Sequence, residues 1–565
     1  MTFTPGTFPN FIADLNPVFQ RVSPSYTGAS GDFDIIIVGS GIGGGVLADA
    51  LADMQDGRRI LVLEAGTFLY PTHVYNCARL SNDQVAKRFG CRTFWQAAQR
   101  GDDGNPFFIG EFPQMNLGGR SIFWSGLIPT LQDWELDFFP DKVRAAFTSG
   151  LLDEAGRKMN QSLTLGDVAE GIVQRLRATD LAADFEIVQT PRALDQPYLQ
   201  ASGEAAKDFP RESTGVFNTA ELLVNQLKLS GDHNSGAEPQ GLKMLLNHYV
   251  EDVIRIPDPD GRLEVVSRNT LTGEARFFRA KTVVLAGGSI ESPKLLRRST
   301  IGRTLDQSVQ DLIGVGLTDH PTTGVFHSQA THIAGLAIPR GISAKIILYS
   351  RGLAGDGAAV RYPFNIEMNV NHEYWHLREN DPSSPSEPFP AAGPPSIEIK
   401  FSFGNPLDPD NAILSADHLG YVPEIRFRNQ SHTDHLRRNR FPALAGWPER
   451  TDQEIFDLIN GMARRVIGKF DNNGVAATPW ETMGQDGHGF GWGTVHHAVG
   501  SLRMPSKARH DQDFTPGVVE ENLEVRGGQG RGLYVCDMSV MPFSAAANPV
   551  RHLVALALRL AKEIG

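Results

Sequence analysis

Two histidines stand side by side near the C-terminal end of the chain, in the stretch GTVHHAVGSLRMP at residues 493–505. Imidazole titrates near neutral pH, so a histidine can take a proton from a substrate under physiological conditions. Most histidines are structural, however, and the pair alone leaves His496 and His497 open between a catalytic base and polar loop residues. The elements that must position them decide between the two roles.

A dinucleotide-binding turn is predicted near the other end of the chain, in FDIIIVGSGIGGGVLADALAD at residues 33–53. The β-branched run at 35–38 predicts a strand buried on both faces, and the apolar residues after the glycines recur at helical spacing. Gly39, Gly41 and Gly44 match G-x-G-x-x-G in that context. They permit a tight turn, close approach of a pyrophosphate and close helix packing, while the helix N-terminus offers free amides.

A second apolar strand, RILVLEAG at residues 59–66, ends in Glu64. An acidic residue at this place in the motif hydrogen-bonds the ribose hydroxyls of a dinucleotide. Strand, glycine motif, helix, strand and acid in this order predict a bound dinucleotide.

Four further segments resemble the glucose-methanol-choline (GMC) flavin oxidoreductases. They are NLGGRSIFWSGLI at 116–128, VVLAGGSIESPKL at 283–295, GVGLTDHP at 314–321, and GLYVCDMSVMPFSAAANPVRHLVALALRLAKEI at 532–564. The resemblance implies FAD as the cofactor and an α/β fold, α+β overall, with a Rossmann-like FAD-binding domain. It also implies a second, substrate-binding domain built on a largely antiparallel sheet. Three stretches in that part of the chain, ISAKIILYSR at 342–351, SIEIKFSF at 396–403 and VPEIRFR at 422–428, predict strands, and their alternation of apolar and polar residues predicts a sheet with one covered face. The expected boundaries are 30–165, 205–320 and 487–565 for the FAD domain, and 166–204 and 321–486 for the substrate domain.

The resemblance assigns the catalytic pair. The family has a histidine three residues before the glycine of a His-x-Val-Gly turn, which matches His497, with Val499 and Gly500. His497 would take the hydroxyl proton of an alcohol whose hydride goes to flavin N5, and His496 would be structural. Asn548 matches the partner and would orient the hydroxyl, because an amide does not titrate. Helix capping by Asn548 alone is the alternative, because asparagine is a preferred cap.

The cofactor residues beyond the glycine motif also follow from the resemblance. They are Gly118, Gly119, Ser125, Val250, Gly287 and Asp537. The flavin loop is similar to that of the pyranose-oxidase branch, which commonly attaches its flavin through a histidine where this chain has Phe123. Phenylalanine has no nucleophilic atom, so we expect noncovalent FAD. Ser125 would hydrogen-bond near flavin N5 or serve only as a small residue.

The expected substrate is a secondary alcohol of a sugar, glycoside or other polyol, with O2 or a quinone-like compound as electron acceptor. Three alternatives stay open. The first is a different reaction class on the same scaffold, such as a lyase or photodecarboxylase, and the second is an oxidase of sterols or simple alcohols. A nicotinamide-dependent dehydrogenase or a noncatalytic nucleotide-binding module is a third. The proline-rich segment 371–396 would be either an active-site lid or a surface loop.

Composition limits the remaining function classes. The 565 residues carry a net charge of −12 without basic clusters, so nucleic acid is not expected as a partner. We expect a soluble, cytoplasmic protein without a membrane segment, since no signal-like start and no long apolar run is present. The three cysteines Cys77, Cys91 and Cys536, and the histidines of SHTDH at 431–435, do not form a metal-ligand pattern.

Overall fold

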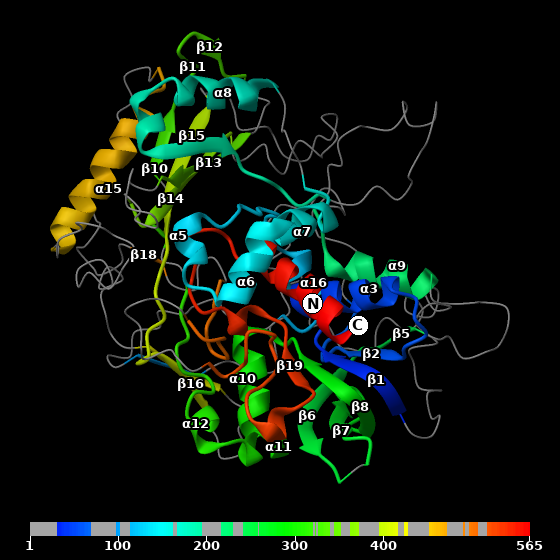
Figure 1. The fold of residues 1–565 in the computed structure, drawn as a ribbon. Helices are drawn as coiled ribbons and strands as arrows, with labels where there is room; N and C mark the ends of the chain where they lie inside the picture. Colours follow the sequence, from blue (N-terminus) through cyan, green and yellow to red (C-terminus); the bar gives the residue numbers. More distant parts are fainter. Residues whose placement is uncertain are drawn as a thin grey trace, which may run out of the picture.

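The computed structural model describes residues 31–68, 98–101, 114–161, 167–194, 216–229, 241–257, 259–319, 322–323, 326–339, 344–351, 362–371, 395–415, 423–427, 451–471, 490–491, 497–506 and 517–565. Two sheets lie apart in this structure, one with the strands nearest the two ends of the chain and one built from its middle (Figure 1). The fold is mixed α/β, as predicted from the sequence.

The first sheet is mostly parallel at its centre. Strand β1 pairs in parallel with β2 on one side and β8 on the other, and β5 follows β2. Strand β8 is long enough to pair with two neighbours on its other edge, antiparallel β7 at its start and parallel β19 at its end. The strands are β1 (Gly31–Val38), β2 (Ile60–Leu63), β5 (Leu242–Leu245), β6 (His248–Arg255), β7 (Leu263–Asn269), β8 (Ala275–Leu285) and β19 (Leu533–Val535).

Helices cover this first sheet, and two of them follow the segments expected to hold the cofactor. Helix α3 (Ile42–Asp53) leaves β1 and packs against α16 (Val550–Ile564) and α9 (Thr219–Leu229) (Figure 1). Helix α10 (Gly288–Arg298) leaves β8 and is followed by α11 (Thr300–Thr304) and α12 (Gln307–Gln310). Both connections bring a helix N-terminus to the carboxyl edge of a parallel strand, where open α/β sheets bind their ligands.

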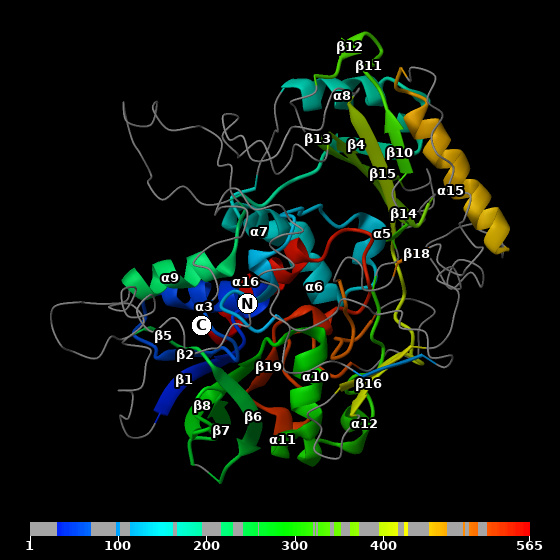
Figure 2. The ribbon, with the colours of Figure 1, turned by 180° about the vertical axis from the view of Figure 1, so that it is seen from behind.

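The second sheet is antiparallel in all its pairings among the described residues. Its order is β18-β9-β15-β14-β13-β4, with β10 beside β15. The strands are β4 (Phe185–Gln189), β9 (Thr322–Thr323), β10 (Phe326–Gln329), β13 (Ala344–Ser350), β14 (Phe364–Val370), β15 (Ser396–Phe403) and β18 (Phe490–Gly491). Helices α8 (Asp167–Arg177) and α15 (Asp452–Ile467) pack on it, as the view from behind shows (Figure 2).

Two expectations for this sheet differ from the structure. The alternating pattern of its strands predicts one covered face, but β13 and β14 are buried almost throughout. On these two strands the polar side is covered as well, by the segments around α5 (Asp133–Leu136), as the hydrogen bond from Thr130 N–H to Tyr349 shows, whereas the first half of β15 keeps the predicted alternation. The strand predicted from VPEIRFR is β17 (Pro423–Phe427), which joins a separate sheet with β16 (Ala412–Ser415) and β3 (Ala98–Gly101).

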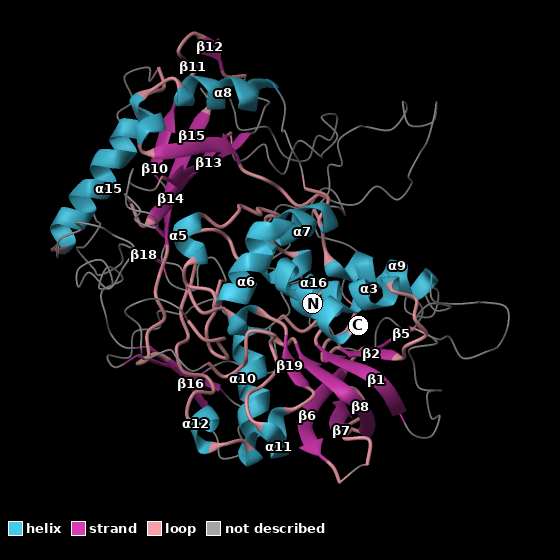
Figure 3. Cartoon of the chain, viewed as in Figure 1, coloured by secondary structure: helices cyan, strands magenta, loops and turns pink. Residues whose placement is uncertain are grey.

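The remaining helices and strands connect the two sheets. Helices α6 (Asp141–Ala146) and α7 (Leu152–Lys158) lie between them in the cartoon coloured by secondary structure (Figure 3). A small hairpin, β11 (His332–Ile333) and β12 (Leu336–Ala337), lies at the far end of the second sheet.

No described helix combines the length and apolar content that a membrane span requires. Cys536 is buried and is not in a disulfide.

Candidate active site

The predicted dinucleotide turn forms between β1 and α3. Gly39 has a φ of +108°, which an L side chain rarely adopts, and its N–H donates to the carbonyl of Leu63, 2.8 Å away. A Cβ at Gly44 would strike the carbonyl of Gly39, and one at Gly43 would strike that of Cys536. A Cβ at Gly41, by contrast, would meet no atom within 4 Å. Two of these glycines therefore serve packing, and Gly41 borders open space at the helix N-terminus.

Glu64 is buried directly beside this turn. Its carboxylate accepts hydrogen bonds from the hydroxyl and the backbone N–H of Ser40, at 2.6 and 3.1 Å, and from Gly66 N–H at 2.8 Å. Burial raises the pKa of the Glu64 carboxyl, and these hydrogen bonds oppose that rise. The carboxylate thus ties the end of β2 to the glycine turn.

The flavin loop predicted at 116–128 lies against the same turn. Gly118 N–H donates to the hydroxyl of Ser40 at 3.0 Å, and Gly119 lies next to Gly41, since its Cβ would come within 3.2 Å of that Cα. Gly118 and Gly119 have φ angles of +82° and +52°, so the loop requires glycine at both positions. Ser40 therefore joins both glycine segments. The sequence analysis missed this role because the G-x-G-x-x-G motif does not specify which residue stands between its first two glycines.

The residues after the two glycines differ in exposure. The Trp124 indole N–H donates to the carbonyl of Phe217 at 2.7 Å, which fixes the ring against the loop before α9. Phe123 is partly buried against the core, and Ser125 is exposed in the protein as described. An exposed Ser125 is available to a ligand, whereas the Trp124 side chain is committed to the protein.

Asp537, at the end of β19, holds the second dinucleotide-side turn. Its carboxylate accepts from Gly288 N–H at 2.9 Å, from the Ser292 hydroxyl at 2.5 Å, and from Ser539 N–H at 2.9 Å. Burial raises the pKa of this carboxyl, and these bonds counteract the rise. The C-terminal strand is thereby joined to the first turn of α10. Gly287, the residue before that helix, is exposed.

Val250 was predicted from the resemblance as a cofactor residue, and the structure places it inside β6. It is buried, and its carbonyl accepts a hydrogen bond from Arg298 at 2.6 Å. Two residues earlier, His248 N–H donates to the carbonyl of Glu64 at 2.8 Å. Val250 therefore lies on a strand that is joined to the end of β2, and its contact with a cofactor remains a prediction.

The predicted base begins a segment that is held on both sides. Val499 pairs with Thr318, and the carbonyl of Ala498 accepts from the Ser289 hydroxyl at 2.5 Å. Gly500 has a φ of +89° and a Cβ there would strike the carbonyl of Gly316, so the turn needs its glycine. His497 is thus anchored beside the first turn of α10, the turn that Asp537 also holds. His496 lies outside the described residues.

Asn548 lies one residue before Pro549, the N-cap of α16, and no side-chain hydrogen bond caps this helix. Capping therefore does not explain the asparagine, which is 8% exposed. The loop before it pairs with the segment that follows β15, because Asn405 and Ser544 exchange two backbone hydrogen bonds of 2.7 and 3.1 Å. The His497 segment reaches the same region, since Leu502 N–H donates to the carbonyl of Ser539 and Met504 N–H to that of Val540.

Glu135 supports this loop from α5 and is absent from the sequence predictions. It is fully buried, and its carboxylate accepts from Ala547 N–H at 3.2 Å and from Gln132 N–H at 2.7 Å. Burial raises its pKa from 4.5 to about 7. No local pattern marks this residue, because its partner lies 412 positions away in the sequence.

The donor set around the two glycine turns fits an FAD molecule. A Cβ at Gly288, like one at Gly41, would meet no protein atom within 4 Å, so open space borders the first residues of both α3 and α10. Helix N-termini carry amides without intrahelical partners and a partial positive charge, which suit a pyrophosphate. The described part of the chain holds no cluster of metal-ligating side chains.

A sheet that is mostly parallel at its centre and carries two such turns is typical of a dinucleotide-binding fold. The model of the N-terminal part of GMC oxidoreductases matches residues 233–322 of this chain, and the model of their C-terminal part matches residues 449–557, so the chain is similar to this family in both segments. It is accordingly an FAD-dependent oxidoreductase that acts on CH–OH groups.

Known relatives match nearly the whole chain at low identity. A pyranose dehydrogenase of Agaricus campestris is 24% identical over 93% of this chain and 92% of its own length. A C-glycoside 3-oxidase of Microbacterium trichothecenolyticum is 24% identical over 94% and 96%. A solved formate oxidase of Aspergillus oryzae superimposes with a TM-score of 0.60 at 15% identity, covering 95% of this chain and 98% of that one. The last comparison concerns the fold alone.

Proposed function

We propose that this enzyme oxidises a secondary alcohol of a sugar, glycoside or other polyol, with His497 as the general base. The observation that carries the proposal is that the His497 segment is hydrogen-bonded to Ser539 and Val540, in the stretch that leads from Asp537 to Asn548, and that Asp537 holds the turn at the start of α10. The family relationship supports alcohol oxidation, and the relatives named for pyranose and C-glycoside oxidation support the substrate class.

Each side chain has a defined task in this proposal. The imidazole of His497 removes the hydroxyl proton, while the amide of Asn548 orients the same hydroxyl by hydrogen bonding. When bound, FAD accepts the hydride. Gly41 and the first amides of α3 hold the pyrophosphate, and the flavin loop at Gly118 and Gly119 lets the chain pass close to the cofactor.

The cofactor is held without a covalent bond. Phe123 occupies the place where the pyranose-oxidase branch commonly carries an attaching histidine, and its ring has no nucleophilic atom. Trp124, whose indole is fixed on Phe217, fixes the position of this loop.

The experiment is an anaerobic screen for bleaching of the bound flavin. D-Glucose, a methyl glycoside, a sterol and a simple alcohol are added separately, and air or a quinone is then admitted to identify the electron acceptor. Bleaching by the sugar or the glycoside supports the proposal. Bleaching by the sterol or the simple alcohol alone would assign the substrate to that class instead of the sugars. A flavin that none of these compounds reduces would contradict alcohol oxidation.

A further inference from the structure

The second sheet carries a polar face that is buried in part, most completely at Asn365 and Ser402. Its apolar side is packed with Ile346, Ile366 and Phe401 and covered by α8 and α15. The other side, which we call the polar face, holds residues that the strand register places opposite one another: Lys345, Asn365, Glu367, Asn369, Lys400 and Ser402. Asn365 and Ser402 have no solvent exposure, and Lys345 has 3%. Burying polar groups on this scale costs stability unless each finds a partner.

The members of the polar face satisfy one another, with one exception. Lys345 donates to Asn369 at 2.8 Å, Lys400 pairs with Glu367 at 2.9 Å, and the Ser402 hydroxyl donates to Glu367 at 2.9 Å. Both amide atoms of Asn365, Oδ1 and Nδ2, are buried without a hydrogen-bond partner in the part of the chain that the structure describes. Each such unsatisfied atom costs roughly 1–3 kcal/mol.

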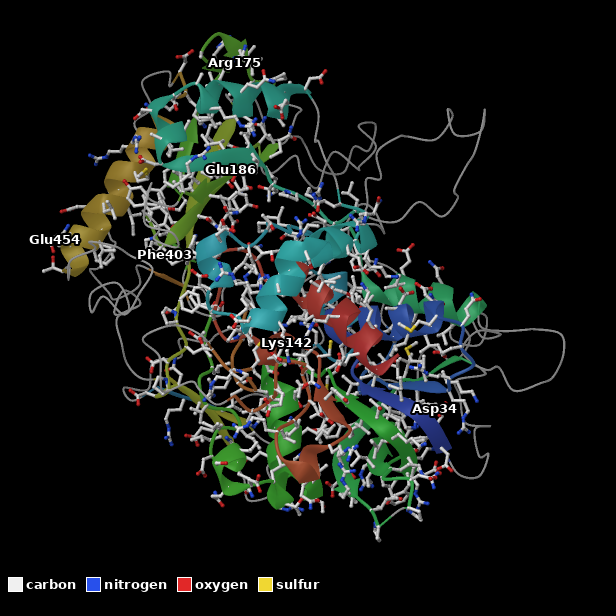
Figure 4. The ribbon with its side chains drawn as sticks, viewed as in Figure 1. Asp34, Lys142, Arg175, Glu186, Phe403 and Glu454 are labelled. Carbon is white, nitrogen blue, oxygen red and sulfur yellow. The ribbon has the colours of Figure 1, made fainter. Side chains whose placement is uncertain are left out.

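Asn365 lies at the end of the sheet that meets the active-site loops. Asn365 stands opposite Ser402, and Ser402 pairs on its other side with Thr322 of β9. Thr322 also pairs with Gly491 of β18, which lies six residues before His497 in the sequence. Three residues beyond Ser402, Asn405 pairs with Ser544 in the loop that leads to Asn548. Figure 4 labels Phe403, the last residue of β15, next to α5, the helix of Glu135.

The neighbouring strand confirms this location. Leu348 of β13 pairs with Ile366 of β14. Tyr349 and Asn365 occupy the next position along these two antiparallel strands. The Tyr349 hydroxyl accepts a hydrogen bond from Thr130 N–H at 3.0 Å, in the segment that follows the flavin loop. Asn365 is therefore enclosed between the flavin-loop side and the Asn548 side of the site.

We propose that the Asn365 amide binds a second hydroxyl of the substrate, next to the carbon that is oxidised. The inference rests on the proposed function and narrows its substrate class to polyols with adjacent hydroxyl groups. A hydroxyl both donates and accepts hydrogen bonds, and an amide offers one oxygen acceptor and two N–H donors. A monohydric alcohol leaves the amide unsatisfied, so Asn365 discriminates against it.

The test compares two ring alcohols that differ by one hydroxyl, trans-1,2-cyclohexanediol and cyclohexanol. In the wild-type holoenzyme the diol should reduce the flavin with a KM about 10-fold to 100-fold lower than cyclohexanol. Asn365→Leu and Asn365→Ala should remove that difference by raising KM for the diol, with kcat changed much less. Asn369→Leu is the matched control, since Asn369 lies on the same face but is bonded to Lys345. It should keep the preference for the diol.

Thermal melting of the substrate-free holoenzyme gives a readout that does not depend on turnover. Asn365→Leu replaces two unsatisfied buried atoms by a side chain of similar size, so its melting temperature should equal or exceed that of wild type. Asn369→Leu removes one hydrogen-bond partner of the buried Lys345 and should lower the melting temperature. Equal KM values for the two alcohols in wild type would overturn the inference, as would an unchanged diol preference in both Asn365 variants. A clear melting decrease in Asn365→Leu with wild-type melting in Asn369→Leu would also contradict it. If instead no alcohol bleaches the wild-type flavin, the proposed function fails. The melting comparison then still shows whether the buried Asn365 amide lacks hydrogen-bond partners.

Discussion

The carboxylate of Glu135 accepts a hydrogen bond from the backbone N–H of Ala547, the residue that precedes Asn548. This bond attaches a short helix after the flavin loop to the loop that presents the proposed substrate-orienting amide. The same carboxylate accepts from Gln132 N–H at the start of its own helix. Glu135 is thus a positioning residue, and its ionisation state bears on the stability of the site.

Glu135 should make stability depend on pH between about 4.5 and 7. Its folded-state pKa of about 7 exceeds its usual 4.5, because burial disfavours the charged form. Its contribution to stability is complete below pH 4.5 and is lost as the pH rises through 7, by on the order of 3 kcal/mol. Denaturation of wild type and Glu135→Gln at several pH values measures this loss. Wild type should gain stability over the variant as the pH falls from 7.5 to 5, and a difference that does not vary with pH would contradict the assignment.

Replacing His497 by alanine should leave FAD bound and slow flavin reduction about 10²-fold to 10⁴-fold, the usual cost of losing a general base. Asn548→Ala should cost less, because it removes an orienting hydrogen bond and keeps the base. His496→Ala should be close to wild type. Stopped-flow reduction under anaerobic conditions orders the three variants. Slow flavin reduction in His496→Ala together with a normal rate in His497→Ala would move the catalytic assignment to His496.

Gly41 and Gly43 should respond differently to the same substitution. A Cβ at Gly41 meets open space and its φ of −62° suits any residue, so Gly41→Val should fold but lose FAD. A Cβ at Gly43 would strike the carbonyl of Cys536, so Gly43→Val should destabilise the protein itself. Flavin absorbance and melting temperature, measured on both variants, separate the two effects. Normal flavin content in Gly41→Val would refute the cofactor site.

Mild denaturation should release the flavin from the protein in unmodified form, because Phe123 cannot form a covalent bond to it. Precipitation with acid or heat, followed by absorbance of the supernatant, measures the release. Yellow colour that stays with the precipitated chain would show attachment at some other residue.

Local patterns predicted the strand, the glycine turn and the helix that the structure has at β1 and α3. The β-branched run of β1, the glycine spacing and the start of α3 all depend on residues within 20 positions of one another, so periodicity and turn chemistry locate them. Asn548 was ambiguous from sequence because asparagine also caps helices; in the structure the cap is Pro549. The assignment of His497 and Asn548 to catalysis stays a prediction.

Glu135 and Asn365 could not be found from sequence. A glutamate in a short helix and an asparagine in a strand look like ordinary surface residues, and only long-range packing buries them. The same packing explains why β13 and β14 are covered on both faces although the alternation predicts one covered face. Burial of a polar face depends on what a different part of the chain places over it, and periodicity within a strand carries no such information.

Strand β8 pairs with β1, which lies about 250 residues earlier, and with β19, which lies about 250 residues later. During synthesis the ribosome therefore releases the two glycine turns long before Asp537 can join them. We expect nascent chains that end before β19 to keep the second turn unanchored and to bind FAD poorly, since loop closure over such distances is slow. We therefore expect FAD to bind late in the synthesis of the chain, after β19 has emerged from the ribosome.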